Sequence, residues 1–218
     1  MRVSAHIYRA STTSFASTLC QGEIISDLER IRLAPECLER EHLSPIDLIR
    51  VPHPLAIIMS QDCDLEQDFR VRQAENFPLL STDRPPSDKL IPNVLFCNVV
   101  TAAQLYQPPA INSRIWERIK INKDERYHFL QSIEGGCDGQ QIGLPELTID
   151  FKRFFTMPTE EVYQRLRMAG TKRRACLNSP YLEHLSSRFS FYLGRVGLPE
   201  DHFSEPADIL QGPKTRSP

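Results

Sequence analysis

The sequence lacks long apolar runs. No stretch of about 18 consecutive apolar residues occurs in its 218 residues, so no segment is suited to a membrane-spanning helix. Polar residues interrupt every apolar cluster in the first thirty positions, which excludes the apolar core of a secretory signal. We therefore expect a cytosolic (cytoplasmic) protein with no membrane partner.

Closely spaced cysteines are also missing. The six cysteines lie 17 to 40 residues apart and form no C-x-x-C pair. This spacing fits neither a compact zinc site nor a small disulfide scaffold. We expect reduced thiols and no metal or other cofactor at these positions, which are Cys20, Cys37, Cys63, Cys97, Cys137 and Cys176.

The motifs of several large enzyme classes are absent. There is no H-E-x-x-H, no G-x-S-x-G, no Walker glycine loop and no G-x-G-x-x-G, which excludes standard zincin, α/β-hydrolase, P-loop and Rossmann chemistry. Nine glycines against 17 prolines exclude a collagen-like or linker-dominated chain. With 40% hydrophobic and 25% charged residues, the composition is that of one globular domain, or one domain with a helical appendix.

The small net charge of −2 conceals an uneven distribution. Residues 151–199 carry nine basic and three acidic residues, a net charge of +6, which leaves −8 for the remainder. Such a segment either attracts a polyanion or docks onto its own acidic partner. Its densest cluster, a candidate binding patch, is Lys172, Arg173 and Arg174.

The apolar pattern predicts an α+β protein. Five short strands, with no long helix between them, favour a small, mainly antiparallel barrel or curled sheet. Helical spacing then predicts a helix over residues 159–169 and another from Pro180 to Val196, with Ser179 as N-cap and Pro180 at the first helical position. The predicted strands are 22–26, 54–60, 93–101, 126–130 and 146–151.

These elements suggest four parts of the chain. An N-terminal segment, 1–19, precedes the sheet or barrel at 20–157. A basic helical extension follows at 158–199 and packs on the sheet. The last part, 200–218, contains the polar stretch from Gly212 to Pro218 and is expected to be disordered.

The densest polar cluster follows the predicted strand 54–60 directly. A strand that runs into polar residues places their side chains at a sheet edge, where binding sites commonly form. The two carboxylates could bind a divalent cation or supply a general base, and the thiol could act as a nucleophile beside His53. Alternatively, the carboxylates cap the next helix and the thiol only packs. The cluster is Ser60, Gln61, Asp62, Cys63 and Asp64.

The order of these segments resembles the SH3-like barrel of the PemK/MazF toxin ribonucleases. The resemblance covers roughly residues 20–157 and rests on Gly22-Glu23-Ile24, on Pro54 to Ser60, on Val94 to Thr101 and on a late Leu-x-x-Asp strand. In that family an arginine precedes the proline of the second strand, and a hydroxyl at the end of the next strand helps to cleave RNA. Here His53 occupies the arginine position and Thr101 the hydroxyl position.

A second resemblance carries no activity. Uncharacterised bacterial proteins share the Ser-Gln-x-Cys-Asp-Leu stretch at Ser60 to Leu65 and end near the Arg-Val-Gly-Leu-Pro stretch at Arg195 to Pro199.

Three functional hypotheses follow. The first is a non-catalytic binding module of a prokaryotic toxin–antitoxin or phage-defence system, which engages a partner protein, or alternatively RNA, through the cluster at 60–64 and the basic residues 172–174. The second is a PemK-like endoribonuclease, with His53 as general acid or base, Thr101 as phosphate donor, and Asp62 or Asp64 orienting the histidine. The third is a thiol- or metal-dependent hydrolase built on residues 62–64. The ribonuclease hypothesis requires His53, Thr101 and the 60–64 cluster to lie close together.

Overall fold

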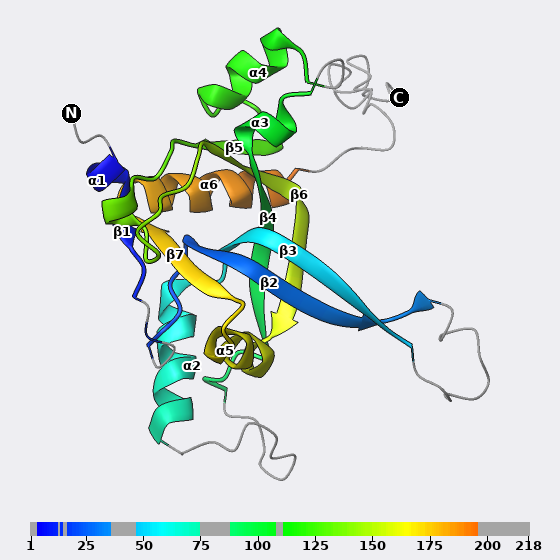
Figure 1. Ribbon diagram of the computed structural model, residues 1–218, viewed down its shortest axis with the longest axis vertical. Coiled ribbons are helices and arrows are strands. Elements are labelled where there is room, and N and C mark those ends of the chain that lie inside the picture. The colour runs from blue at the N-terminus through cyan, green and yellow to red at the C-terminus, as the bar shows by residue number, and fades with distance from the viewer. Residues whose placement is uncertain are drawn as a thin grey trace, which may run out of the picture.

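Seven strands form one antiparallel sheet in the order β1-β7-β2-β3-β4-β6-β5 (Figure 1). The computed structural model describes residues 4–12, 14, 17–35, 47–74, 88–107 and 111–195. Within these ranges the strands are β1 (Tyr8–Ala10), β2 (Glu23–Leu33), β3 (Leu48–Ile58), β4 (Asn93–Thr101), β5 (Tyr127–Leu130), β6 (Leu147–Pro158) and β7 (Lys172–Leu177).

The α+β class and the antiparallel sheet are confirmed, but the barrel is not. The edge strands β1 and β5 pair only with β7 and β6 respectively, so the sheet stays open. The predicted strand 93–101 coincides with β4. β2 and β6 are longer than predicted, at 11 and 12 residues, because both continue into charged segments.

The segment 158–199 is not purely helical, which corrects the sequence-based division of the chain. Its residues 172–177 form β7, which lies inside the sheet between β1 and β2. β7 pairs with both neighbours in antiparallel register, and Cys176 lies opposite Glu23 of β2. The segment 158–199 therefore contributes a strand to the interior of the sheet.

Helices cover both faces of the sheet (Figure 1). α6 (Tyr181–Leu193) packs on one face, where Leu185 and Phe189 join Ile24 and Ile57 in one core cluster. α2 (Asp62–Ala74) and α5 (Thr159–Arg167) pack on the other face, in a cluster that includes Ile25. Neighbouring residues of a strand point to opposite faces, so Ile24 and Ile25 belong to different cores.

Four shorter elements complete the described residues. α3 (Ala102–Leu105) and α4 (Ser113–Lys120) lie near β5, and Ile119 of α4 is buried beside Tyr127 of β5. α1 (Ser4–Ile7) leads into β1, and the short 3-10 helix η2 (Gly135–Cys137) lies beside β1. Among the described residues, no helix has the length and apolar character required to cross a lipid bilayer.

The two C-terminal helices occur where the apolar spacing predicts them. The start of α6 differs in detail: Pro180 is the N-cap residue rather than the first helical residue, and no side chain caps this end. α6 also ends earlier than predicted, at Leu193 with Gly194 as C-cap, rather than at Val196. The predicted disordered tail, 200–218, lies outside the described residues.

Candidate nucleic-acid interface

Ser60 and Asp62 hold neighbouring segments of backbone together. Ser60 Oγ accepts a hydrogen bond from the N–H of Leu95 in β4 (2.9 Å). Asp62, in the first turn of α2, accepts one from the N–H of Gln21 through Oδ1 (2.6 Å). Both side chains therefore have structural partners, although these lie on other segments of the chain and not in the next helix, where the capping alternative expected them.

The remaining members of the 60–64 cluster contact one another. The exposed Cys63 thiol donates to Gln61 Oε1 (3.7 Å) and to Asp64 Oδ1 (3.5 Å). Asp64 and Ser60 line a hollow of about 460 Å³ together with Phe189 of α6. Within the described ranges, no histidine contacts the Cys63 thiol, so nothing there activates it as the hydrolase hypothesis requires.

His53 is held by an amide rather than by a carboxylate. Its Nδ1 donates to Asn98 Oδ1 (2.7 Å), and its ring stacks on Phe155 with 3.8 Å between ring centroids. Nε2 is buried and has no hydrogen-bond partner among the described residues. Burial lowers the pKa of His53, which the Asn98 hydrogen bond only partly opposes. Neither Asp62 nor Asp64 orients this ring, contrary to the ribonuclease hypothesis.

Thr101 is a helix cap at the far end of β4. Its hydroxyl accepts a hydrogen bond from the N–H of Gln104 (3.1 Å), and the Gln104 side chain accepts one from the N–H of Thr101, which completes a capping box for α3. Asn93, at the other end of β4, lines the hollow beside Asp64. At about 3.3 Å per residue, β4 separates the two ends by roughly 26 Å. The structure does not bring Thr101 and Asp64 together.

The predicted basic patch at 172–174 is internal, so its assignment as a binding surface is wrong. Arg173 makes a buried two-point ion pair with Glu23 (2.6 and 2.8 Å). Arg174 makes another with Asp138 (2.8 Å for each contact), and Lys172 is half-buried. The two arginines therefore follow the docking alternative, because their charge is neutralised inside the protein.

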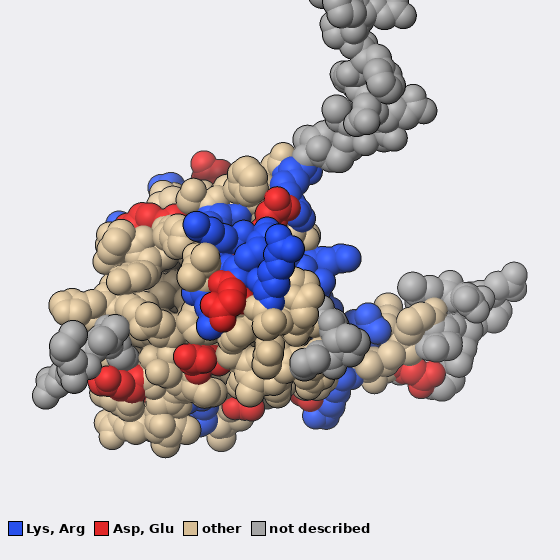
Figure 2. Space-filling model, turned by 90° about the horizontal axis from the view of Figure 1, so that it is seen from above, with Lys and Arg blue, Asp and Glu red and all other residues tan. Residues whose placement is uncertain are grey.

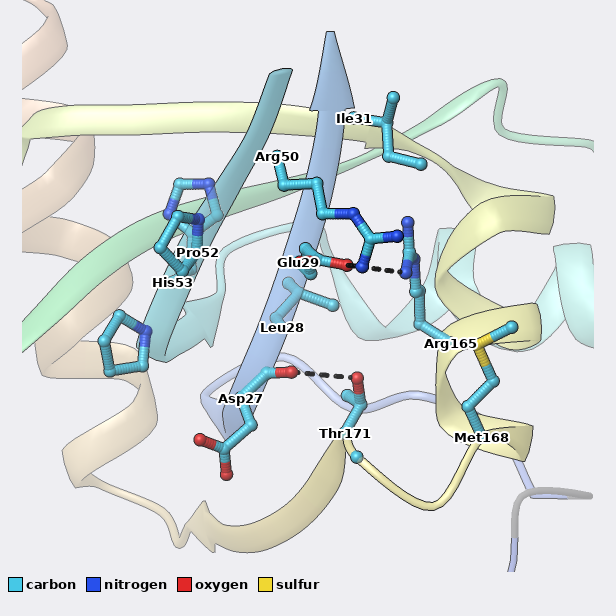
Figure 3. A pocket seen from close by; sticks show the side chains of 12 residues that line it. Asp27, Leu28, Glu29, Ile31, Arg50, Pro52, His53, Arg165, Met168 and Thr171 are labelled. Carbon is cyan, nitrogen blue, oxygen red and sulfur yellow. Dashed lines mark hydrogen bonds and ion pairs between the residues drawn. The ribbon is translucent and has the colours of Figure 1, made fainter. Parts of the chain in front are cut away.

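A hollow of about 530 Å³ lies between the β2–β3 ribbon and α5 (Figure 3). Glu29 of β2 lies between two guanidinium groups, at 3.5 Å from Arg50 and 3.2 Å from Arg165. The shared carboxylate weakens the attraction of both arginines for an external anion. Side chains alternate along β3, so Arg50 and His53 project from opposite faces of the ribbon, and the histidine ring is turned away from Glu29.

A group of exposed and half-buried basic side chains lies on another surface, which we call the basic face. Figure 2 shows a concentration of Lys and Arg on the side of the molecule that carries α4 and the end of α6. The contributing segments, 113–126, 150–153 and 181–195, contain nine basic and five acidic residues. The basic residues are Arg114, Arg118, Lys120, Lys123, Arg126, Lys152, Arg153, Arg188 and Arg195.

The turn at 121–126 joins these segments into one surface. Arg118 of α4 donates to the backbone oxygen of Lys123 (3.4 Å), and Arg195 pairs with Glu125 (2.6 Å). Arg126 makes a two-point contact with Asp150 at the end of the β5–β6 pairing (2.8 and 2.6 Å). α4, β6 and α6 therefore meet at this turn.

An irregularity in β6 turns two further cations outward. The register of β6 against β4 shifts between Asp150 and Phe154, and the intervening Lys152 and Arg153 are exposed. Such bulges redirect side chains away from the regular alternation of a strand. β5 pairs only as far as Asp150, so these cations lie on a strand edge that β5 leaves uncovered.

Several of these cations have no carboxylate neighbour. Arg114, Arg118, Lys123 and Lys152 make no ion pair with any described residue. Arg114 and Arg118 are four residues apart on α4 and therefore share one exposed side of the helix. Their charges are available to an external anion.

Arg188 of α6 adds a half-buried cation whose hydrogen bonds, among the described residues, all go to neutral groups. Its guanidinium donates to Asn122 Oδ1 (3.0 Å), to the backbone oxygen of Tyr127 (3.1 Å), to His128 Nδ1 (3.1 Å) and to the backbone oxygen of Asp124. Burial lowers the pKa of Arg188, and the nearby Asp124 partly opposes that shift. A half-buried cation without a directly bonded carboxylate strengthens the positive potential beside it.

Exposed aromatic rings accompany the cations. Phe191 is 66% exposed and lines a hollow of about 420 Å³ with Lys123, His184 and Arg188. Phe154, next to Arg153, is 49% exposed. Rings of this kind beside arginines can stack on unpaired bases, which duplexes do not present.

The sequence predicted only half of this surface. Lys152, Arg153, Arg188 and Arg195 fall in the basic segment 151–199, whereas the contribution of 113–126 was missed. That segment carries three acidic residues beside five basic ones, so its net charge is small. The four-residue spacing of Arg114 and Arg118 on a helix was the available signal.

We compared the chain with known proteins. No protein-family model, no curated protein and no solved structure matches it.

Proposed function

We propose that this protein is a non-catalytic binding module that binds single-stranded nucleic acid on its basic face, with RNA as its preferred ligand. The observation that carries the proposal is the gathering of α4, the 121–126 turn, β6 and the end of α6 into one cationic surface. Phosphates would contact the unpaired cations, and bases would stack on Phe191 and Phe154.

Within the described part of the chain, the predicted acid–base groups do not assemble into one site, which favours binding over cleavage. Asn98 holds His53, Thr101 caps α3, and the carboxylates of residues 62 and 64 lie at the start of α2. No arrangement of a general base, an acid and a phosphate donor links these groups. The toxin–antitoxin or phage-defence setting stays a prediction from the sequence.

A binding titration tests the proposal. Fluorescence anisotropy would measure binding of a labelled 15-nucleotide RNA, the matching DNA strand and the matching duplex at 50 to 300 mM salt. We expect the single strands to bind more tightly than the duplex. The triple variant Arg118→Ala/Lys123→Ala/Lys152→Ala should bind more weakly, and its log–log salt slope should fall by about 2, because each lost phosphate contact removes about 0.7.

A charge-matched control separates the basic face from net charge. Arg50→Ala/Arg70→Ala/Arg167→Ala removes three exposed cations from β3, α2 and α5 and should leave the RNA affinity nearly unchanged. Phe191→Ala should weaken single-strand binding by 5- to 100-fold without changing the salt slope, since stacking contributes about 1–3 kcal/mol per base. Equal losses in both triple variants would refute the proposal. So would undetectable nucleic-acid binding at low salt, which would leave a partner protein as the ligand.

A further inference from the structure

Two cysteines that are distant in sequence lie side by side at the start of β2. Cys20 begins the turn that leads into β2, in which the N–H of Glu23 donates to the backbone oxygen of Cys20 (3.2 Å) and Gly22 has a positive φ of 72°. Cys176 of β7 is the cross-strand partner of Glu23. As a result Cys20 Sγ, Cys176 Sγ and a Glu23 carboxylate oxygen lie within 4.8 Å of one another.

The three groups do not form a ready metal site, because Glu23 is already committed. Both of its oxygens accept hydrogen bonds from Arg173 (2.6 and 2.8 Å), and Oε2 also accepts one from the N–H of Cys20 (3.2 Å). A metal ion would have to displace a buried guanidinium and leave it unpaired, which is costly. The chemistry of this cluster is therefore that of its two thiols.

The two thiols differ in exposure and in acidity. Cys20 is half-buried, whereas Cys176 is buried, and the Cys176 Sγ lies 3.3 Å from Ser11 Oγ. A hydrogen bond with Cys176 lowers the pKa of Cys20 to about 7, with Arg173 acting in the same direction and with burial, Glu23 and Asp62 opposing it. The same hydrogen bond raises the pKa of Cys176, which stays protonated.

We propose that Cys20 and Cys176 form a peroxide-sensitive pair, in which Cys20 is oxidised first and Cys176 closes a disulfide bond. A reactive, accessible thiol beside a second thiol is the usual arrangement of such sites. The assignment holds whether or not the basic face binds nucleic acid.

Hydrogen peroxide supplies the oxidising equivalents. The Cys20 thiolate attacks one peroxide oxygen, the O–O bond breaks, and the departing hydroxide takes a proton to leave as water, which gives a sulfenic acid. Cys176 sulfur then attacks Cys20 sulfur, the S–O bond breaks, and the hydroxide leaves with the Cys176 proton as a second water. Two thiols lose two electrons in total, and one peroxide becomes two waters.

Two of the other described cysteines, Cys63 and Cys97, provide contrasts. Cys63 is exposed, and its hydrogen-bond contacts are with Gln61 and Asp64 rather than with a second thiol. Cys97 is buried, and burial raises its pKa. We therefore expect neither to form the intramolecular disulfide, and Cys63→Ser is the matched control.

Peptide mapping tests the proposal on the full-length protein. The reduced, folded protein would be treated with hydrogen peroxide near pH 7, denatured in the presence of an alkylating agent, digested without reductant and analysed by mass spectrometry. We expect a peptide that links Cys20 to Cys176, present in Cys63→Ser and lost in Cys176→Ala. In Cys176→Ala, dimedone should label a sulfenic acid on Cys20.

The pH dependence of alkylation gives a second readout. The rate at Cys20 should have a midpoint near pH 7 in the native protein and should shift toward the ordinary thiol value of about 8.5 in Cys176→Ala. Circular dichroism would establish that Cys176→Ala folds. If it does not, Cys176→Ser would be used in its place. The proposal is wrong if the linked peptide does not form in the folded protein, or if the midpoint stays unchanged when the Cys176 thiol is removed.

Discussion

Replacing Arg173 by methionine should sharply destabilise the protein. The guanidinium is the direct ion-pair partner of Glu23, whose side chain is 0% exposed, and it also donates to Ser17 Oγ (2.5 Å) and to the backbone oxygen of Thr18 (2.7 Å). Removing one member of a buried pair costs about 3–5 kcal/mol. With the loss of the loop contacts, at about 1 kcal/mol each, the penalty reaches roughly 5 kcal/mol. That equals the whole stability of many domains, about 5–15 kcal/mol.

Urea unfolding followed by circular dichroism and by the fluorescence of the single tryptophan, Trp116, would measure this cost. Arg173→Met/Glu23→Leu should be more stable than Arg173→Met alone, because the double variant leaves no unpaired buried carboxylate. Lys172→Ala is the control on the same strand and should change the free energy of unfolding by no more than about 0.5 kcal/mol. The reasoning would be refuted if Arg173→Met lowered the free energy of unfolding by less than about 1 kcal/mol, or if the double variant were less stable than Arg173→Met.

Three further predictions concern single side chains. Thr101→Ala should lower the free energy of unfolding by about 1 kcal/mol in urea titrations, and Thr101→Ser should restore most of it, because the hydroxyl caps α3. Burial alone would raise the pKa of Asp138, but hydrogen bonds from Arg174 and from two backbone N–H groups outweigh it and lower the pKa below 3.8. This carboxylate therefore stabilises the fold above that pH and ceases to do so as the pH falls through the lowered value, and Asp138→Asn should flatten the acid limb of stability against pH. Burial, reinforced by Arg188, lowers the pKa of His128 to about 3, so its imidazole NMR shifts should be those of a neutral ring at pH 5. A charged ring at that pH would contradict the burial argument.

Local residue patterns were sufficient to predict the strands and helices that have a clear composition or apolar spacing. β4 is rich in β-branched and aromatic residues, and the C-terminal helices repeat apolar residues every three or four positions. One readable signal was missed, since Thr101 and Gln104 have the spacing of a capping box. That spacing explains the hydroxyl at the end of β4 without any catalytic role.

The wrong predictions for residues 172–174 and for His53 concern side chains whose partners are distant in the sequence. Three consecutive basic residues at 172–174 are typical of a solvated surface, and the sequence does not indicate that Glu23, 150 residues earlier, accepts the charge of Arg173. The environment of His53 was equally hidden, because its stacking partner Phe155 lies on β6, far along the chain. Distances between side chains on different strands depend on the order of those strands, which one sequence did not specify.

The position of β7 has a consequence for synthesis on the ribosome. Among the described residues, β7 is the last strand to emerge, yet it lies between β1 and β2, which are the first two. A nascent chain that ends before residue 172 therefore exposes the inner edge of β2, together with the unneutralised carboxylates of Glu23 and Asp138. An unpaired strand edge can pair with a strand of another chain. Until β7 has been synthesised, we therefore expect incomplete chains of this protein to be prone to associate with one another.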